Sequence, residues 1–231
     1  MPIRHEITPE ELGRSMRWFP LVGIAIACIA GFVDLILTPL VAAPVRTILV
    51  IVVLIAITGA LHLDGLMDTC DAIFAFTSPE RRLEIMRDSR VGSFAIVGAA
   101  TLLLMKYAAI LSLPPDRHLA AFIAMGAISR WAMVFSMVRY PVARQSGLGY
   151  EFKKAVGRKE LAIATATAVL AALVAGLAGI AVFILALIAT MAMARYTMSK
   201  IPGLTGDIYG AISEGTETLV ALALPPLWRL L

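Results

Sequence analysis

Residues 161–194 read LAIATATAVLAALVAGLAGIAVFILALIATMAMA, and this run contains no charged side chain. A helix that crosses a membrane needs roughly 20 mostly apolar residues, so the run is long enough for two such helices. Gly176 and Gly179 lie near its middle, where glycine favours a turn. The stretch therefore predicts two membrane helices joined by a short connection.

The rest of the chain has the same character. Two further runs without charge lie between Arg17 and Asp34 and between Arg46 and Asp64, and 60% of the 231 residues are hydrophobic while 16% are charged. A soluble core of this size could not bury so much apolar surface. We therefore predict an all-α, polytopic membrane bundle of six or seven transmembrane helices that forms one integral-membrane domain, residues 1–231. The expected helices are 18–37, 46–63, 92–113, 118–138, 160–176, 180–196 and 206–225.

The last of these segments carries Asp207, Glu214 and Glu217. Acidic side chains are costly in a spanning helix unless they face protein or water. Residues 206–225 are therefore expected to span with their acids turned inward, while a re-entrant or interfacial segment remains an alternative.

Basic residues are distributed unevenly along the expected helices. If the N-terminus is cytoplasmic, fifteen of the 20 basic residues fall on the cytoplasmic side, mostly in the loops 64–91 and 139–159. An excess of Lys and Arg marks cytoplasmic connections. The chain is thus predicted to have a cytoplasmic N-terminus and to carry its chemistry in these two loops. The first 17 residues mix acids and bases and lack an apolar core, unlike a cleavable signal peptide.

The densest chemical signal is HLDGLMDTCD, residues 62–71. Asp64, Asp68 and Asp71 have the spacing i, i+4, i+7, which places them on one helical face. Carboxylates so close repel one another, and a divalent cation with hard oxygen ligands, Mg²⁺ or Mn²⁺, would remove that repulsion. Gly65 would let a ligand or helix approach closely. An acidic stretch facing solvent after a membrane helix is the ordinary alternative, and His62 fits an interfacial hydrogen bond as well as an active role.

A second motif is SPERRLEIMRDSRVG, residues 78–92. Ser78 and Pro79 fit the N-cap and first position of a short amphipathic helix. Asp88 then lies between Arg87 and Arg90, where a carboxylate can complete a metal site while guanidinium groups bind phosphate. An incidental salt bridge in a basic cytoplasmic loop is the alternative.

Three further cations are candidates for the site. Lys106 and Arg130 fall within apolar spans, where ionisable residues are functional candidates by default. Arg130 needs a partner, which the acids of the last segment could supply, while Lys106 fits snorkelling to the interface as well as substrate binding. Arg144 belongs to the glycine-containing loop RYPVARQSGLG, residues 139–149, which could bind an anionic substrate or be a plain basic loop.

Taken together, these motifs resemble the cobalamin synthase family, also called adenosylcobinamide-GDP ribazoletransferase. The matching segments occur in family order: WFPLVG (18–23), GALHLDGLMDTCD (59–71), EIMRDSRVG (84–92), PVARQSGLG (141–149) and LTGDIYGA (204–211). One departure is Cys-Asp-Ala at residues 70–72, where the family usually has Ala-Asp-Gly, and it leaves every carboxylate in place.

The resemblance implies that α-ribazole or its 5′-phosphate attacks adenosylcobinamide-GDP and that GMP leaves. It implies Mg²⁺, with Mn²⁺ as the alternative metal, and a multi-pass protein of a prokaryotic inner membrane whose active site faces the cytoplasm. Nothing points to nucleic acid, and self-association is left open. The implied catalytic and metal-binding residues are Asp64, Asp68, Asp71 and Asp88, with Asp88 either the fourth ligand or the base. The implied substrate-binding residues are His62, Gly65, Arg87, Ser89, Arg90, Lys106, Arg130, Arg144 and Asp207.

Two other classes compete with this interpretation. A CDP-alcohol phosphotransferase also uses clustered aspartates, but Leu66-Met67-Asp68 lacks the Ala-Arg pair that follows Asp-Gly in that family, and the later GxxxDxxxD spacing is missing. An ion-coupled transporter could use the intramembrane charges, but such proteins often have internal repeats, and the two halves of this chain show none.

Overall fold

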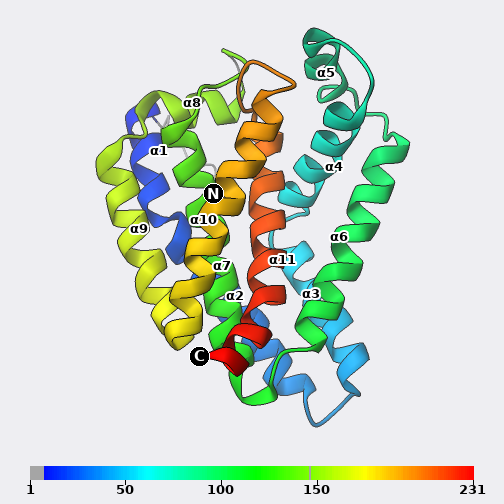
Figure 1. The fold of residues 1–231 in the computed structure, drawn as a ribbon, viewed down its shortest axis with the longest axis vertical. Coiled ribbons are helices and arrows are strands. Elements are labelled where there is room, and N and C mark those ends of the chain that lie inside the picture. The colour runs from blue at the N-terminus through cyan, green and yellow to red at the C-terminus, as the bar shows by residue number, and fades with distance from the viewer. Residues whose placement is uncertain (1–7, 146) are drawn as a thin grey trace, which may run out of the picture.

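The computed structural model describes residues 8–145 and 147–231, and this part of the chain is a bundle of helices (Figure 1). Its only pairing of extended backbone is an isolated bridge between Val142 and Leu204. The elements are α1 Pro9–Ser15, η1 Met16–Trp18, α2 Phe19–Leu37, α3 Ala43–Ile57, α4 Leu61–Phe74, α5 Pro79–Ile85, α6 Ser93–Leu111, η2 Pro115–Arg117, α7 His118–Arg139, α8 Leu148–Ala155, α9 Arg158–Leu173, α10 Gly176–Met198 and α11 Gly206–Leu230.

Helices α7 and α11 form the centre of the bundle. They pack against each other, with α2 and α9 on α7, and with α4, α6 and α10 on α11. In Figure 1, α9 and α10 lie to one side of α11, and α4 and α6 lie to the other. The buried core follows the same two helices, from Phe122 and Ile128 on α7 to Ile212 and Leu224 on α11.

Helices α2 and α7 cross at a pair of glycines. A Cβ atom on Gly23 would lie 2.0 Å from the carbonyl oxygen of Gly126, and one on Gly126 would lie 2.3 Å from that of Gly23. Only residues without a Cβ allow this approach, and close backbone contact between small residues is how helices pack in lipid.

Four helical segments in the described part are long and apolar enough to cross a membrane: Glu10–Leu37, Ser93–Leu111, Pro115–Arg139 and Gly176–Met198. Their outward faces are apolar, as at Phe32 and Leu35 on α2 and at Leu177 and Ile188 on α10, all exposed. Water would not favour such faces, whereas lipid does. These findings support an all-α, multi-pass membrane protein.

The prediction of one continuous helix over 46–63 is wrong. Helix α3 ends at Ile57, and α4 begins at Leu61 after a bend of 89°. Gly59 and Ala60 both have φ of +59°, the left-handed region that ends helices. Counted as one bent span, α3 and α4 would make a fifth membrane crossing. Helices α4, α5 and α8 also occupy much of the two segments that were expected to be loops.

Other local predictions are confirmed. The run 161–194 forms two helices, α9 and α10, which are separated at Val174–Ala175, and Gly176 has φ of +72°. Of these two described helices, α10 is long and apolar enough to cross a membrane and α9 is too short, so the run is confirmed as two helices but not as two membrane spans. The oxygen of Ser78 accepts a hydrogen bond from the backbone N–H of Arg81, and Pro79 begins α5. Residues 206–225 lie within α11, whose glutamates are buried as expected.

Candidate active site

The three aspartates of the 62–71 motif lie on α4, as their spacing predicts. Asp64 is exposed in the first turn of α4, and Asp68 is partly buried one turn later. The charge of Asp68 interacts with those of Asp207, Asp64 and Asp71. The helix therefore gathers negative charge on one face, and α11 adds a fourth carboxylate to it.

Gly65 and Gly210 bring α4 and α11 into backbone contact. A Cβ on Gly65 would lie 2.7 Å from the carbonyl oxygen of Asp207, and one on Gly210 would lie 3.1 Å from that of His62. The close approach expected of Gly65 is confirmed, and its partner is a helix. The first turns of α4 and α11 consequently meet, which places Asp207 within electrostatic range of Asp64.

The carboxylate of Asp71 accepts hydrogen bonds from the start of α6. One carboxylate oxygen accepts the backbone N–H of Gly92 at 2.7 Å, and the other accepts that of Ala95 at 2.8 Å. The first N–H groups of a helix have no partner within it, so Asp71 caps α6 from another helix. This contact holds α6 against α4.

Arg144 reaches the acids from the segment between α7 and α8. Two backbone hydrogen bonds hold Leu204 beside this segment. The N–H of Ala143 donates to the carbonyl oxygen of Leu204 at 2.8 Å, and the N–H of Leu204 donates to the carbonyl oxygen of Pro141 at 2.9 Å. Arg144 Nη2 donates to the Leu83 carbonyl oxygen at 2.9 Å. Burial lowers the pKa of Arg144, but an arginine stays cationic at neutral pH. Its charge interacts with Asp207 and Asp68.

A cavity of about 390 Å³ opens between these elements. Asp64, Arg144 and Asp207 line it, together with His62 and Gly65, so five of the predicted site residues meet at one place. The remaining lining is Phe19, Leu61, Met133, Met137, Val142, Gly147, Gly149, Tyr150, Phe152, Leu204, Thr205, Gly206, Tyr209 and Gly210. The cavity thus combines acids and a guanidinium group with a largely apolar wall.

The second predicted motif lies at the surface between α5 and α6. Asp88 and Arg90 form a two-pronged salt bridge, with Nη2 and Oδ2 separated by 2.6 Å. Hydrogen bonds from Arg90 lower the pKa of Asp88 to about 2, so this side chain is a carboxylate at neutral pH. The Arg87 charge interacts with that of Arg144, whereas Asp88, Ser89 and Arg90 do not line the cavity.

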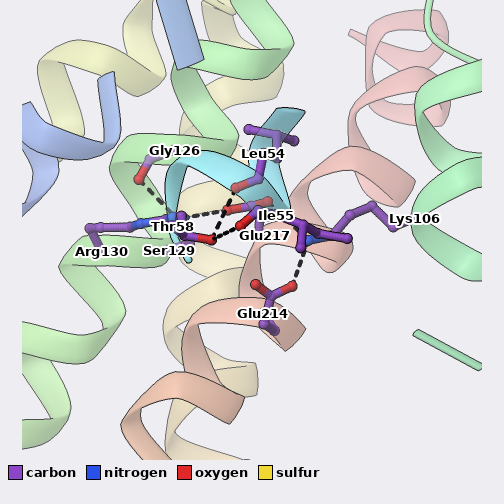
Figure 2. A network of polar contacts seen from close by, with 9 residues as sticks. All are labelled: Leu54, Ile55, Thr58, Lys106, Gly126, Ser129, Arg130, Glu214 and Glu217. Atoms are coloured by element: carbon purple, nitrogen blue, oxygen red, sulfur yellow. Dashed lines mark hydrogen bonds and ion pairs between the residues drawn. The ribbon is translucent and has the colours of Figure 1, made fainter. Parts of the chain in front are cut away.

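Lys106 and Arg130 belong to a buried charge cluster rather than to the cavity wall (Figure 2). Lys106 Nζ lies 2.6 Å from Glu214 and 3.0 Å from Glu217, and Arg130 pairs with the other oxygen of Glu217. The partner expected for Arg130 on the last helix is therefore present. Lys106 does not snorkel, because its side chain is only 4% exposed. Two cations and two anions join α6, α7 and α11 here.

Two basic residues near the site were not predicted from the sequence. Arg82 is buried and donates to the carbonyl oxygens of Ala72 and Ile73, which closes the C-terminal end of α4. Lys153 on α8 similarly donates to Met137 and Val138 at the end of α7. Their only signal was membership of a basic loop, which does not distinguish a helix cap from a solvated cation.

The aspartate side chains of the site fit Mg²⁺ chemically, because carboxylate oxygens are the ligands that this ion prefers. They are not gathered around one point: within the described residues, no three His, Cys, Asp or Glu side chains are placed to hold one metal ion. The charges of Asp64, Asp68 and Asp207 still interact with one another where α4 and α11 meet, so these are the carboxylates that could converge on a cation.

The fold and the site define a class, that of multi-pass helical membrane proteins with a cavity lined by carboxylates and an arginine. The model of one family, described as cobalamin-5-phosphate synthase, matches residues 1–225. The chain therefore belongs to the cobalamin-5-phosphate synthase family, whose members are transferases of cobalamin biosynthesis.

Relatives across diverse bacteria agree with this assignment. The chain is 40% identical to the adenosylcobinamide-GDP ribazoletransferase of Desulforamulus reducens, over 91% of this chain and 85% of that protein. It is 36% identical to the enzyme of the same name from Geotalea daltonii, over 97% and 91%, and 35% identical to that of Escherichia coli, over 93% and 89%. No solved structure matches the chain.

Proposed function

We propose that this protein is an Mg²⁺-dependent transferase that joins adenosylcobinamide-GDP to α-ribazole, or to its 5′-phosphate, and releases GMP. The observation that carries the proposal is the convergence of Asp64, Arg144 and Asp207 on one cavity, in a chain related to enzymes with that name along most of its length. Phosphoryl transfer needs groups that position the phosphate and stabilise its charge, and a guanidinium group and acids that bind a metal ion supply them.

In the proposed reaction, a ribose hydroxyl oxygen of the ribazole attacks the phosphorus that carries the cobinamide. A new P–O bond forms, the bond from this phosphorus to the bridging oxygen breaks, and GMP leaves with the electron pair. In this proposal Asp64 accepts the hydroxyl proton and Arg144 binds a phosphate oxygen, which the presence of both residues in the cavity lining supports.

Asp64, Asp68 and Asp207 are the side chains proposed to hold Mg²⁺. When bound, the ion would neutralise charge on the diphosphate and on the leaving GMP. Asp88, the fourth ligand or base suggested by the resemblance, has a pKa of about 2 because of Arg90. A carboxyl group of that pKa is a weak base at neutral pH, which favours a role in binding over proton transfer.

The proposed membrane topology has six or seven spans, with the N-terminus and the cavity on the cytoplasmic side of a prokaryotic inner membrane. Arg82 lies on α5, Lys153 lies on α8, and Arg144 lies in the segment just before α8. Helices α5 and α8 are at the same end of the bundle (Figure 1). Lys and Arg in short connections mark the cytoplasmic side.

The test is GMP release by the purified protein in detergent or liposomes with Mg²⁺, adenosylcobinamide-GDP and α-ribazole. Asp64→Asn should abolish release without lowering the melting temperature, because Asp64 is exposed. Asp116→Asn, an exposed acid at the opposite end in η2, is the matched control and should retain activity. An unchanged rate in Asp64→Asn, or CMP release from a CDP-alcohol without GMP release, would refute the proposal.

A further inference from the structure

The cavity has two chemically different sides that come from different helices. Phe19 on α2, Met133 and Met137 on α7 and Phe152 on α8 form an apolar side, whereas the acids come from the first turns of α4 and α11. In Figure 1, α8 and α4 lie on opposite sides of the start of α11.

The apolar side is shaped by aromatic rings. The rings of Phe19 and Phe152 meet edge to face, with centroids 5.5 Å apart and an interplanar angle of 80°. Tyr150 lies on the same short helix, and the ammonium group of Lys154 lies 4.8 Å from the centre of its ring. Aromatic walls of this kind bind flat aromatic groups, since every heteroaromatic base has a face that stacks.

The volume of the cavity indicates which of the two proposed substrates, α-ribazole or adenosylcobinamide-GDP, can enter it. Pockets for drug-sized ligands measure roughly 300–1,000 Å³, and this cavity, at about 390 Å³, is near the lower limit. A nucleoside with a two-ring base fits a space of this size. A corrinoid, which is a macrocycle of four five-membered nitrogen rings with long side chains, does not fit.

From these observations we propose that the cavity is the binding site of the nucleoside acceptor. The benzimidazole base of the ribazole lies against Phe19, Met133 and Phe152, and the ribose points towards Asp64 and Asp207. The corrinoid stays outside, and only its diphosphate reaches Arg144 at the polar side. This inference rests on the proposed function and adds to it which substrate enters the protein and which residues select its base.

The test separates the two substrates kinetically. Phe152→Ala removes an aromatic wall and should raise the KM for α-ribazole about 5- to 150-fold, the range for losing one base-stacking ring. The KM for adenosylcobinamide-GDP should stay within about twofold, since this contact does not form part of its site.

The same variant should also change specificity. A riboside whose base is enlarged by a third fused ring should be a poor substrate of the unaltered protein, because the cavity is small. The space opened in Phe152→Ala should improve its kcat/KM relative to α-ribazole by about tenfold or more. A purely structural role for Phe152 would not produce this gain.

Phe135→Ala is the matched control. Phe135 is also a partly buried phenylalanine in an aromatic pair, but it does not line the cavity. It should leave both KM values and the base preference unchanged.

Three results would overturn the inference: an unchanged nucleoside KM in Phe152→Ala, a rise in the corrinoid KM instead, or the same changes in Phe135→Ala. Failure of the unaltered protein to release GMP would refute the proposed function as well. GMP release with an unaltered nucleoside KM in Phe152→Ala would refute the inference alone.

Discussion

Glu217→Gln should strongly destabilise the protein, because Glu217 balances two buried cations. It lies 3.0 Å from Lys106 and also pairs with Arg130. With Glu214, the cluster contains two positive and two negative groups. Glutamine keeps the shape of the side chain but removes one negative charge, which leaves the cluster with an uncompensated positive charge inside the bundle.

The size of the effect follows from the burial of the cluster, since all four residues are less than a tenth exposed. Removing one partner of a buried ion pair costs about 3–5 kcal/mol. A chain of about 150–250 residues loses about 2–4 °C of melting temperature per kcal/mol, so the apparent melting temperature should fall by about 6–20 °C.

The assay is thermal unfolding of the detergent-solubilised protein, followed by size-exclusion chromatography. Glu84→Gln is the control: it breaks the Arg81–Glu84 ion pair, which has a similar distance of 2.6 Å but is exposed, and exposed pairs contribute little. The double variant Glu217→Gln, Arg130→Met restores neutrality and should recover much of the loss. A Glu217→Gln protein as stable as the Glu84→Gln control would refute the reasoning, as would a double variant that loses the sum of both single effects.

Three changes around α4 and the removal of metal give further tests. Asp71→Ala removes the cap of α6 and should lower stability by about 0.5–2 kcal/mol, and an unchanged melting temperature would contradict the capping role. Gly65→Ala puts a methyl group against the backbone of Asp207 and should cost about 1–3 kcal/mol, with a loss of turnover as the acids separate; full activity would show that the helix contact does not matter. Arg82→Met leaves two carbonyl oxygens of α4 without their donor and should make residues 75–92 more sensitive to limited proteolysis, which a protection pattern like that of the unaltered protein would disprove. Chelation with EDTA should stop GMP release, and Mg²⁺ should restore it; activity that persists in excess chelator would remove the metal from the mechanism.

Much of the helical framework could be predicted, because the signals are local. Runs without charge, the turn at Gly176 and the cap at Ser78 depend on a few neighbouring residues. The bend between α3 and α4 could not be predicted, since alanine is disfavoured at the positive φ that Ala60 adopts. The packing of α4 against α11 and α6 compensates for that cost.

The candidate site was predictable in composition but not in arrangement. The spacing of the aspartates placed them on one helical face, but it could not show that Asp71 caps α6 while Asp64 faces the cavity. Likewise, the hydropathy of the spans marked Lys106 as unusual without revealing its partners, more than a hundred residues away on α11. These distinctions depend on tertiary contacts that no local pattern encodes.

The meeting of α4 and α11 also has an electrostatic consequence. Asp64 and Asp207 each occupy the first turn of a helix, where the aligned peptide dipoles amount to roughly half a positive charge. The N-terminal ends of both dipoles therefore lie beside the acidic group, and each contributes about 0.3–1 kcal/mol of stabilisation to a nearby negative charge. The backbone itself thus offsets part of the repulsion between these carboxylates, and replacing either one with lysine would oppose its own helix as well as the arginine beside it.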